Sequence, residues 1–165
     1  MADRRPIGWK QWAEVVPRDP VKARFIGDMP HAWVGSDFIR ATLDRLAYAD
    51  EAREALVLAA GVPESWLAAG EQIGVDALGT PYGVLSYSTH GGVGEVRIHV
   101  EGGIDMPPGG VVLAMPFPIA SATVNGLTVV PEPGRQITVP PAGELVLWSL
   151  PVEVVLHRLP AAQAK

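Results

Sequence analysis

The residues best suited to metal or phosphate chemistry surround a glycine-rich loop in the second half of the chain. They are two histidines, three glycines and two glutamates: His90, His99, Gly91, Gly92, Gly94, Glu95 and Glu101. A metal site needs ligands spaced to surround one ion, and no His-x-His pair occurs here. A phosphate-binding loop needs the N-terminus of a following helix, whereas a strand pattern follows this loop. We therefore expect a hairpin loop that holds no metal and no cofactor.

The neighbouring hydroxyl residues have the types needed for nucleophilic catalysis. Ser86, Ser88 and Thr89 directly precede His90, which could serve as a base. No Gly-x-Ser-x-Gly elbow surrounds either serine, and hydroxyls on a strand commonly lie on its solvated face. The pattern therefore favours an ordinary polar strand over a hydrolase site.

Two carboxylate pairs have the residue types of a glycosidase, whose two carboxyl groups lie about 5 to 10 Å apart in a cleft. The pairs are Glu95 with Glu101, and Asp37 with Asp44. Asp37 and Asp44 fall on one side of a predicted helix, where Arg40 and Arg45 are ordinary charge partners. Solvent-exposed faces explain both pairs, so we predict no catalytic residue.

Aromatic side chains are concentrated in the first part of the chain, at Trp9, Trp12, Trp33 and Trp66. An indole has a large apolar face and one hydrogen-bond donor, so an exposed pair could form a platform for sugar rings. The alternative, which we favour, is that these rings pin an N-terminal arm and a helix onto the rest of the fold.

Composition limits the class of protein. The chain has 165 residues, with 13 basic and 18 acidic side chains, 18 Gly, 16 Pro and no Cys. This length predicts one domain, and the many turn-forming residues favour short strands. A net charge of -5 argues against nucleic acid and against an anionic membrane surface as partners.

Export and membrane signals are not evident. Met1 is followed within a few residues by charges and by Trp9 and Trp12, so the apolar stretch of a secretory signal is missing. The most apolar windows, Val111–Ala122 and Leu145–Leu156, are broken by prolines and fall short of the roughly 20 residues of a spanning helix. We therefore expect a soluble, cytoplasmic chain.

One helix is predicted in the first part of the chain. Apolar residues from Val34 to Ala47 recur at three- and four-residue spacing. Either Ser36 caps this helix, or Asp28 followed by Pro30 opens it earlier, and we choose the earlier start. Residues 50–60 are ambiguous, because Glu51–Ala55 favours helix while Leu56–Leu58 could be a buried strand.

Beyond residue 62 the pattern changes to short turns and strands. One helical turn is expected at Pro63–Leu67, and Val93–Glu101 alternates cleanly, with His99 on the solvent side. Asn125-Gly126 is a strong hairpin signal. Further short strands are predicted at Ile73–Asp76, Tyr82–Thr89, Val111–Met115, Ser121–Val124, Leu127–Val130, Gln136–Val139, Glu144–Trp148 and Val152–His157. The fold class is therefore all-β: an antiparallel two-sheet β-sandwich with an N-terminal arm and one α-helix.

Three segments carry a family resemblance. Phe25–Arg40 (FIGDMPHAWVGSDFIR), Leu56–Pro63 (LVLAAGVP) and Thr80–Ser88 (TPYGVLSYS) resemble the C-terminal region of large bacterial glycoside-hydrolase-like proteins. These join an α/α-toroid catalytic domain, as in α-rhamnosidase-like enzymes, to a C-terminal β-sandwich. Ala122–Gly126 and Ile137–Pro140 are similar to the sandwich endings of those enzymes.

The resemblance implies that Asp28–Ala47 is the last toroid helix and that Leu56–Pro63 is the first sandwich strand. It also implies that a glycan would be touched by residues near the helix start, namely Asp28, His31, Trp33 and Asp37. Nearly the whole toroid lies outside this sequence, and one helix cannot enclose a glycosidic bond.

The expected organisation is an arm and helix at 1–49 packed on the sandwich, a β-sandwich at 50–160 and a tail at 161–165. We expect a non-catalytic β-sandwich accessory module, carbohydrate-associated or structural. The alternatives are a module that docks through the helix, to a second copy or to a separate toroid-domain protein, and a small enzyme using His90 or His99 with Glu95 or Glu101.

Overall fold

The computed structural model describes residues 11–16, 24, 26–129 and 143–158. It divides into two units, Met1–Leu43 and Asp44–Lys165. The division falls a few residues before the expected one at 49/50. The predicted strand at 136–139 and the tail at 161–165 lie outside the described residues.

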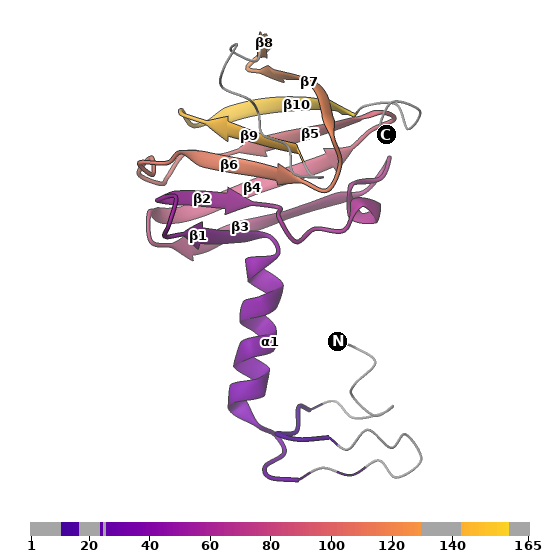
Figure 1. Cartoon of the computed structure of the whole chain (residues 1–165), viewed down its shortest axis with the longest axis vertical. Helices are drawn as coiled ribbons and strands as arrows, with labels where there is room; N and C mark the ends of the chain where they lie inside the picture. Colours follow the sequence, from indigo (N-terminus) through magenta and orange to yellow (C-terminus); the bar gives the residue numbers. More distant parts are fainter. Residues whose placement is uncertain (1–10, 17–23, 25, 130–142, 159–165) are drawn as a thin grey trace. The chain divides into compact units, whose positions relative to one another are not determined.

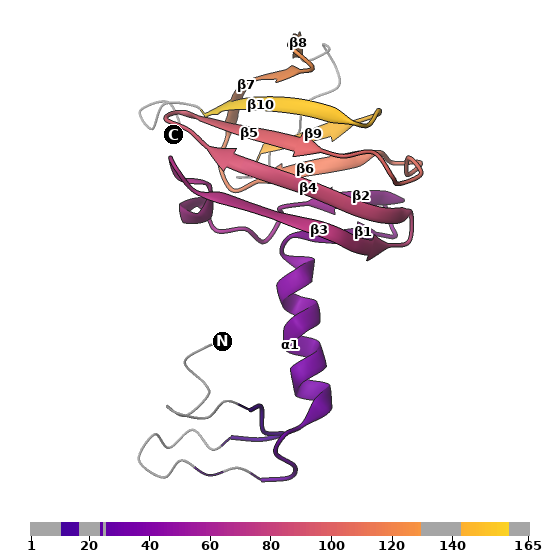
Figure 2. The same ribbon diagram turned by 180° about the vertical axis from the view of Figure 1, so that it is seen from behind.

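Two sheets stacked face to face make up the second unit (Figure 1). The four-stranded sheet has the order β1 (Ala47–Asp50), β2 (Ala55–Leu58), β6 (Val111–Met115), β9 (Gly143–Leu147). The six-stranded sheet, in front in Figure 2, has the order β3 (Gln72–Thr80), β4 (Gly83–Gly91), β5 (Glu95–Val100), β10 (Val152–Arg158), β7 (Ile119–Val124), β8 (Leu127–Val129). The all-β, two-sheet class is confirmed.

The core lies between the sheets and follows the period-two pattern of the strands. Leu56, Leu58 and Leu113 point inward from the four-stranded sheet and are fully buried. On β5 of the other sheet, Val96, Ile98 and Val100 are also fully buried. The alternation predicted for Val93–Glu101 is therefore confirmed, with β5 antiparallel to both β4 and β10.

One pair of strands departs from the antiparallel expectation. β2 runs parallel to β6, with Leu56 opposite Val111 and Leu58 opposite Leu113. Parallel neighbours need a long crossover connection. Here the chain between β2 and β6 passes through β3, β4 and β5 of the other sheet, which supplies that crossover.

The predicted hairpin turn is confirmed. Asn125 and Gly126 have φ values of 50° and 77°, as a type I′ turn requires, and Val124 faces Leu127 across it. The predicted helical turn before Gly70 is also present, as the 3-10 helix η2 (Glu64–Leu67).

The helix is shorter than predicted at both ends, because α1 spans Ala32–Asp44. The segment from Asp28 is not helical, and its carbonyl accepts the Glu14 amide at 3.0 Å. At the other end, the carbonyls of Arg45 and Leu46 accept the amides of Gly61 and Ala59. These bonds end the helix, and Ala47 begins strand β1. The strand expected to be the first of the sandwich, at Leu56–Pro63, is therefore the second, β2.

The ambiguity at residues 50–60 resolves as a turn followed by a strand. The Asp50 carboxylate accepts the amides of Ala52 and Arg53, each at 3.1 Å. The turn does not continue as a helix, because Glu54 has a φ of 49° and the Leu56 amide donates to the Gly110 carbonyl at 3.1 Å.

The outer face of the four-stranded sheet carries an ion-pair network. Arg53 contacts Asp50 of β1 at 2.7 Å and Glu144 of β9 at 3.1 Å. Because β1 and β9 are opposite edges of this sheet, the Arg53 side chain reaches across β2 and β6. The outward side chains of those two strands are small, apolar and buried: Ala55, Val57, Val112 and Ala114.

Arg53 lowers the pKa of Asp50, chiefly through their side-chain hydrogen bond, and Asp50 raises the pKa of Arg53. A carboxyl whose pKa is lower in the folded state contributes stability above its unfolded pKa. It loses that contribution as the pH falls through the folded pKa.

We predict that Arg53→Ala lowers the free energy of unfolding by about 1 kcal/mol near neutral pH, through lost ion pairs and lost cover of the apolar face. The difference from the wild type should shrink as the pH falls from about 4, the ordinary pKa of an aspartate, through the lowered pKa of folded Asp50. Urea denaturation at several pH values measures both effects.

The matched control is Arg97→Ala, which breaks the exposed ion pair with Glu95 on the other sheet. It should change stability by no more than about 0.5 kcal/mol. Equal effects of the two substitutions would contradict the bridging role of Arg53.

Candidate functional site

The segment before α1 is held by a second stretch of the N-terminal arm. The Glu14 amide bonds to Asp28, and Val15 forms an antiparallel bridge with Ile26. The His31 amide donates to the Trp12 carbonyl at 2.7 Å. These bonds fix the backbone from which the four predicted glycan-contacting residues project.

His31 stands immediately before the first helical residue and caps the helix. Its Nδ1 accepts the amide of Val34 at 3.3 Å, in the manner of an N-cap side chain. One of its two ring nitrogens is therefore used within the fold. The structure thus gives His31 a structural contact that the sequence pattern did not predict.

Trp33 and Asp37 lie one helical turn apart, so they share one face of α1. Trp33 is 79% exposed, and Asp37 is exposed as well. Within the described ranges no hydrogen bond or ion pair joins any two of the side chains of Asp28, His31, Trp33 and Asp37. The structure therefore brings Trp33 and Asp37 together on an open surface. The backbones of Asp28 and His31 are bonded to Glu14 and Trp12, and not to each other.

The other tryptophans differ in their surroundings. The ring of Trp12 lies 4.7 Å from that of Phe38 on α1, so the packing interpretation holds for Trp12. Trp66 is 42% exposed, and Trp9 lies outside the described residues. Trp148, which the sequence analysis did not single out, is 58% exposed.

The histidines of the sandwich have partners other than those considered from sequence. His99 lies on the outer face, partly exposed as expected, and its Nδ1 contacts the Glu153 carboxylate from β10. The Glu95 carboxylate pairs with Arg97 at 2.9 Å, and His157 Nδ1 lies 3.9 Å from the same carboxylate. No described group of three or more His, Asp or Glu side chains could hold a metal ion.

The hydroxyl residues of β4 fall on both faces of the sheet. Thr89 points inward, is 1% exposed and donates to the Ile73 carbonyl, so a solvated face is wrong for this residue. Ser86 and Ser88 are partly buried and lie on the outer face. The cross-strand neighbour of Ser88 is His99, which the sequence could indicate only once the register was known.

No protein-family model, curated protein or solved structure matches the chain. Among the described residues, no helix has the length and apolar character needed to cross a membrane. The resemblance to glycoside-hydrolase-like proteins therefore depends on the sequence segments that carry it.

We predict that His31→Ala exposes the amides of α1 to faster hydrogen exchange, by about fivefold, since loss of an N-cap costs about 1 kcal/mol. His31→Asn keeps a capping acceptor and should restore protection. Hydrogen exchange with peptide resolution measures both variants. Identical exchange of α1 in the wild type and in His31→Ala would show that the cap contributes nothing.

Proposed function

We propose that the chain is a non-catalytic β-sandwich accessory module of glycoside-hydrolase type, associated with carbohydrate through the start of α1. One observation carries this proposal: Trp33 leaves 79% of its side chain in solvent, on the same helix face as Asp37. An apolar ring of this size gains stability when a ligand covers it, and its N–H and the neighbouring carboxylate offer one donor and one acceptor group.

The chemistry of a sugar ring suits this pair. A pyranose has a face of C–H groups that can pack on the indole, and peripheral hydroxyls that can donate to the Asp37 carboxylate. An open surface of this kind binds a ligand without enclosing it or excluding water around a glycosidic bond. This agrees with a non-catalytic, accessory role.

A glycan array with the wild type and the Trp33→Ala, Asp37→Ala double variant tests the proposal. We expect the signal of bound glycans to fall at least about tenfold in the double variant, because an exposed aromatic anchor commonly dominates binding. The matched control is Trp148→Ala, which removes an exposed tryptophan from the sandwich unit. Binding that survives in the double variant, or no binding by the wild type, counts against the proposal.

The second candidate is an interaction module that self-associates through α1. No residue of α1 is buried, and Ile39 and Leu43, four residues apart, are 61% and 37% exposed. In a two-fold pair of these helices, the two side chains of one copy would meet the same two of the other, as a closed dimer requires. Exposed apolar side chains on one helix face favour such an interface.

Sedimentation equilibrium distinguishes this candidate from the first. If α1 mediates self-association, Ile39→Lys should weaken the dimer at least about tenfold. Asp37→Lys, on the opposite side of the helix, should leave the association unchanged. A monomer at all concentrations would remove the second candidate and leave the first intact.

A further inference from the structure

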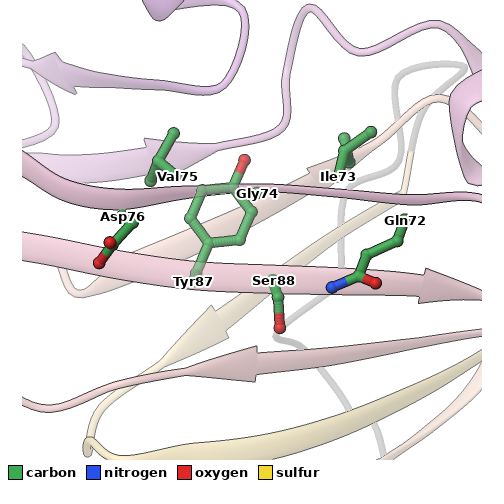
Figure 3. Close-up of a pocket in the computed structure, with 7 residues that line it drawn as sticks. All are labelled: Gln72, Ile73, Gly74, Val75, Asp76, Tyr87 and Ser88. Atoms are coloured by element: carbon green, nitrogen blue, oxygen red, sulfur yellow. The ribbon is translucent and has the colours of Figure 1, made fainter.

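A shallow hollow of about 410 Å³, open to solvent, lies on the six-stranded sheet where edge strand β3 meets β4 (Figure 3). Its lining consists of Gln72, Ile73, Gly74, Val75, Asp76, Tyr87 and Ser88. In Figure 3 the side chains of Gln72 and Ser88 point to the side of the sheet away from Tyr87, whose ring turns into the core. The outer side of the hollow is therefore lined by polar groups.

Gly74 keeps the middle of the hollow free of side-chain atoms. It faces Ser88 across the strand pair and lies between Gln72 and Asp76 on β3. A Cβ atom at this position would lie 2.2 Å from the Tyr87 carbonyl oxygen, so no other residue fits without moving the backbone. The glycine thus allows β3 to approach β4 closely and leaves the position between its two polar neighbours empty.

A β-bulge fixes the carboxylate at the rim. The register shifts between Val75 and Leu78, and Ala77 has a φ of 53°, which is unusual for a residue with a side chain. The Ser86 hydroxyl accepts the Ala77 amide at 3.0 Å and donates to Asp76 Oδ1 at 3.2 Å. Ser86 therefore holds both the strained backbone and the carboxylate, and Asp76 Oδ2 has no partner among the described residues.

The polar lining continues across the sheet. Ser88 lies beside His99, and His99 lies beside Glu153, in one row perpendicular to the strands. His99 Nδ1 lies against the Glu153 carboxylate. In the described part of the chain, the Gln72 amide and the Ser88 hydroxyl make no side-chain hydrogen bond, so both can serve a ligand.

We propose that this hollow binds a sugar residue through vicinal hydroxyl groups, as a second carbohydrate contact of the module; this inference rests on the proposed function. A carboxylate accepts two hydroxyl donors, while an amide and a hydroxyl group both donate and accept. A polyhydroxyl ligand satisfies all of them. An anion would be repelled by Asp76, and a ligand without a hydrogen-bond donor would leave its Oδ2 without a partner.

NMR titration of the isotope-labelled full chain with glucose, galactose, mannose and rhamnose, each up to about 0.1 M, tests the site at the weak affinity of open surfaces. We expect at least one sugar to shift the backbone amides of Gly74, Asp76 and Ser88. The Asp76→Asn and Ser88→Ala variants should each weaken that sugar about tenfold, because each loses a hydrogen bond to the ligand. The control variant Ser121→Ala, at an exposed position of β7 in the same sheet, should leave the affinity for that sugar unchanged.

The outcomes separate this inference from the proposed function. Sugar-induced shifts confined to residues 31–37 overturn the hollow as a site and support the contact at α1. Shifts confined to the hollow, and reduced by both variants, support this inference while removing the contact at Trp33. Shifts at the hollow that both variants leave unchanged, or no shift there with any sugar, overturn the inference.

Discussion

The burial of inward-facing side chains between the two sheets is the constraint on which the rest of the structure depends. Leu58 and Leu113 of one sheet, and Ile98 and Leu156 of the other, are completely shielded from water. Burial of such side chains is the main favourable term in folding. The Tyr87 hydroxyl, buried with them, donates to the Leu46 carbonyl at 2.8 Å, and burial raises the pKa of this phenol. The inward-facing side chains are therefore packed against one another and are not accessible to a ligand.

The outer faces of the two sheets differ in polarity, because the side chains on these faces do not have to pack in the core. The four-stranded sheet presents small apolar side chains under the Arg53 network. The six-stranded sheet presents polar side chains in rows, including Ser88, His99 and Glu153. Hydrogen-bonding capacity is thus concentrated on the six-stranded sheet, and the exposed indole of Trp33 belongs to the other unit. The proposed carbohydrate contacts use side chains that lie outside the buried core.

Local patterns predicted most of the strands but not their neighbours. The alternation of Val96, Ile98 and Val100 and the Asn125-Gly126 turn depend on residues close in sequence, and both were predicted correctly. Helix α1 was predicted too long, because its ends depend on partners elsewhere, such as Ala59 and Gly61. Of the candidate site, the sequence did not predict the 79% exposure of Trp33, because packing of this indole on the fold was the favoured interpretation. The cap made by His31 required the actual helix start.

The sequence by itself determined the all-β class, the buried side of Val93–Glu101 and the hairpin at Asn125-Gly126, because side-chain alternation and positive φ are properties of neighbouring residues. Only the tertiary structure decided that β2 runs parallel to β6, that Arg53 reaches Glu144 and that Ser88, His99 and Glu153 share a row. Such contacts join residues far apart in the chain. They are set by strand order and register, which follow from packing of the whole core and not from any local pattern.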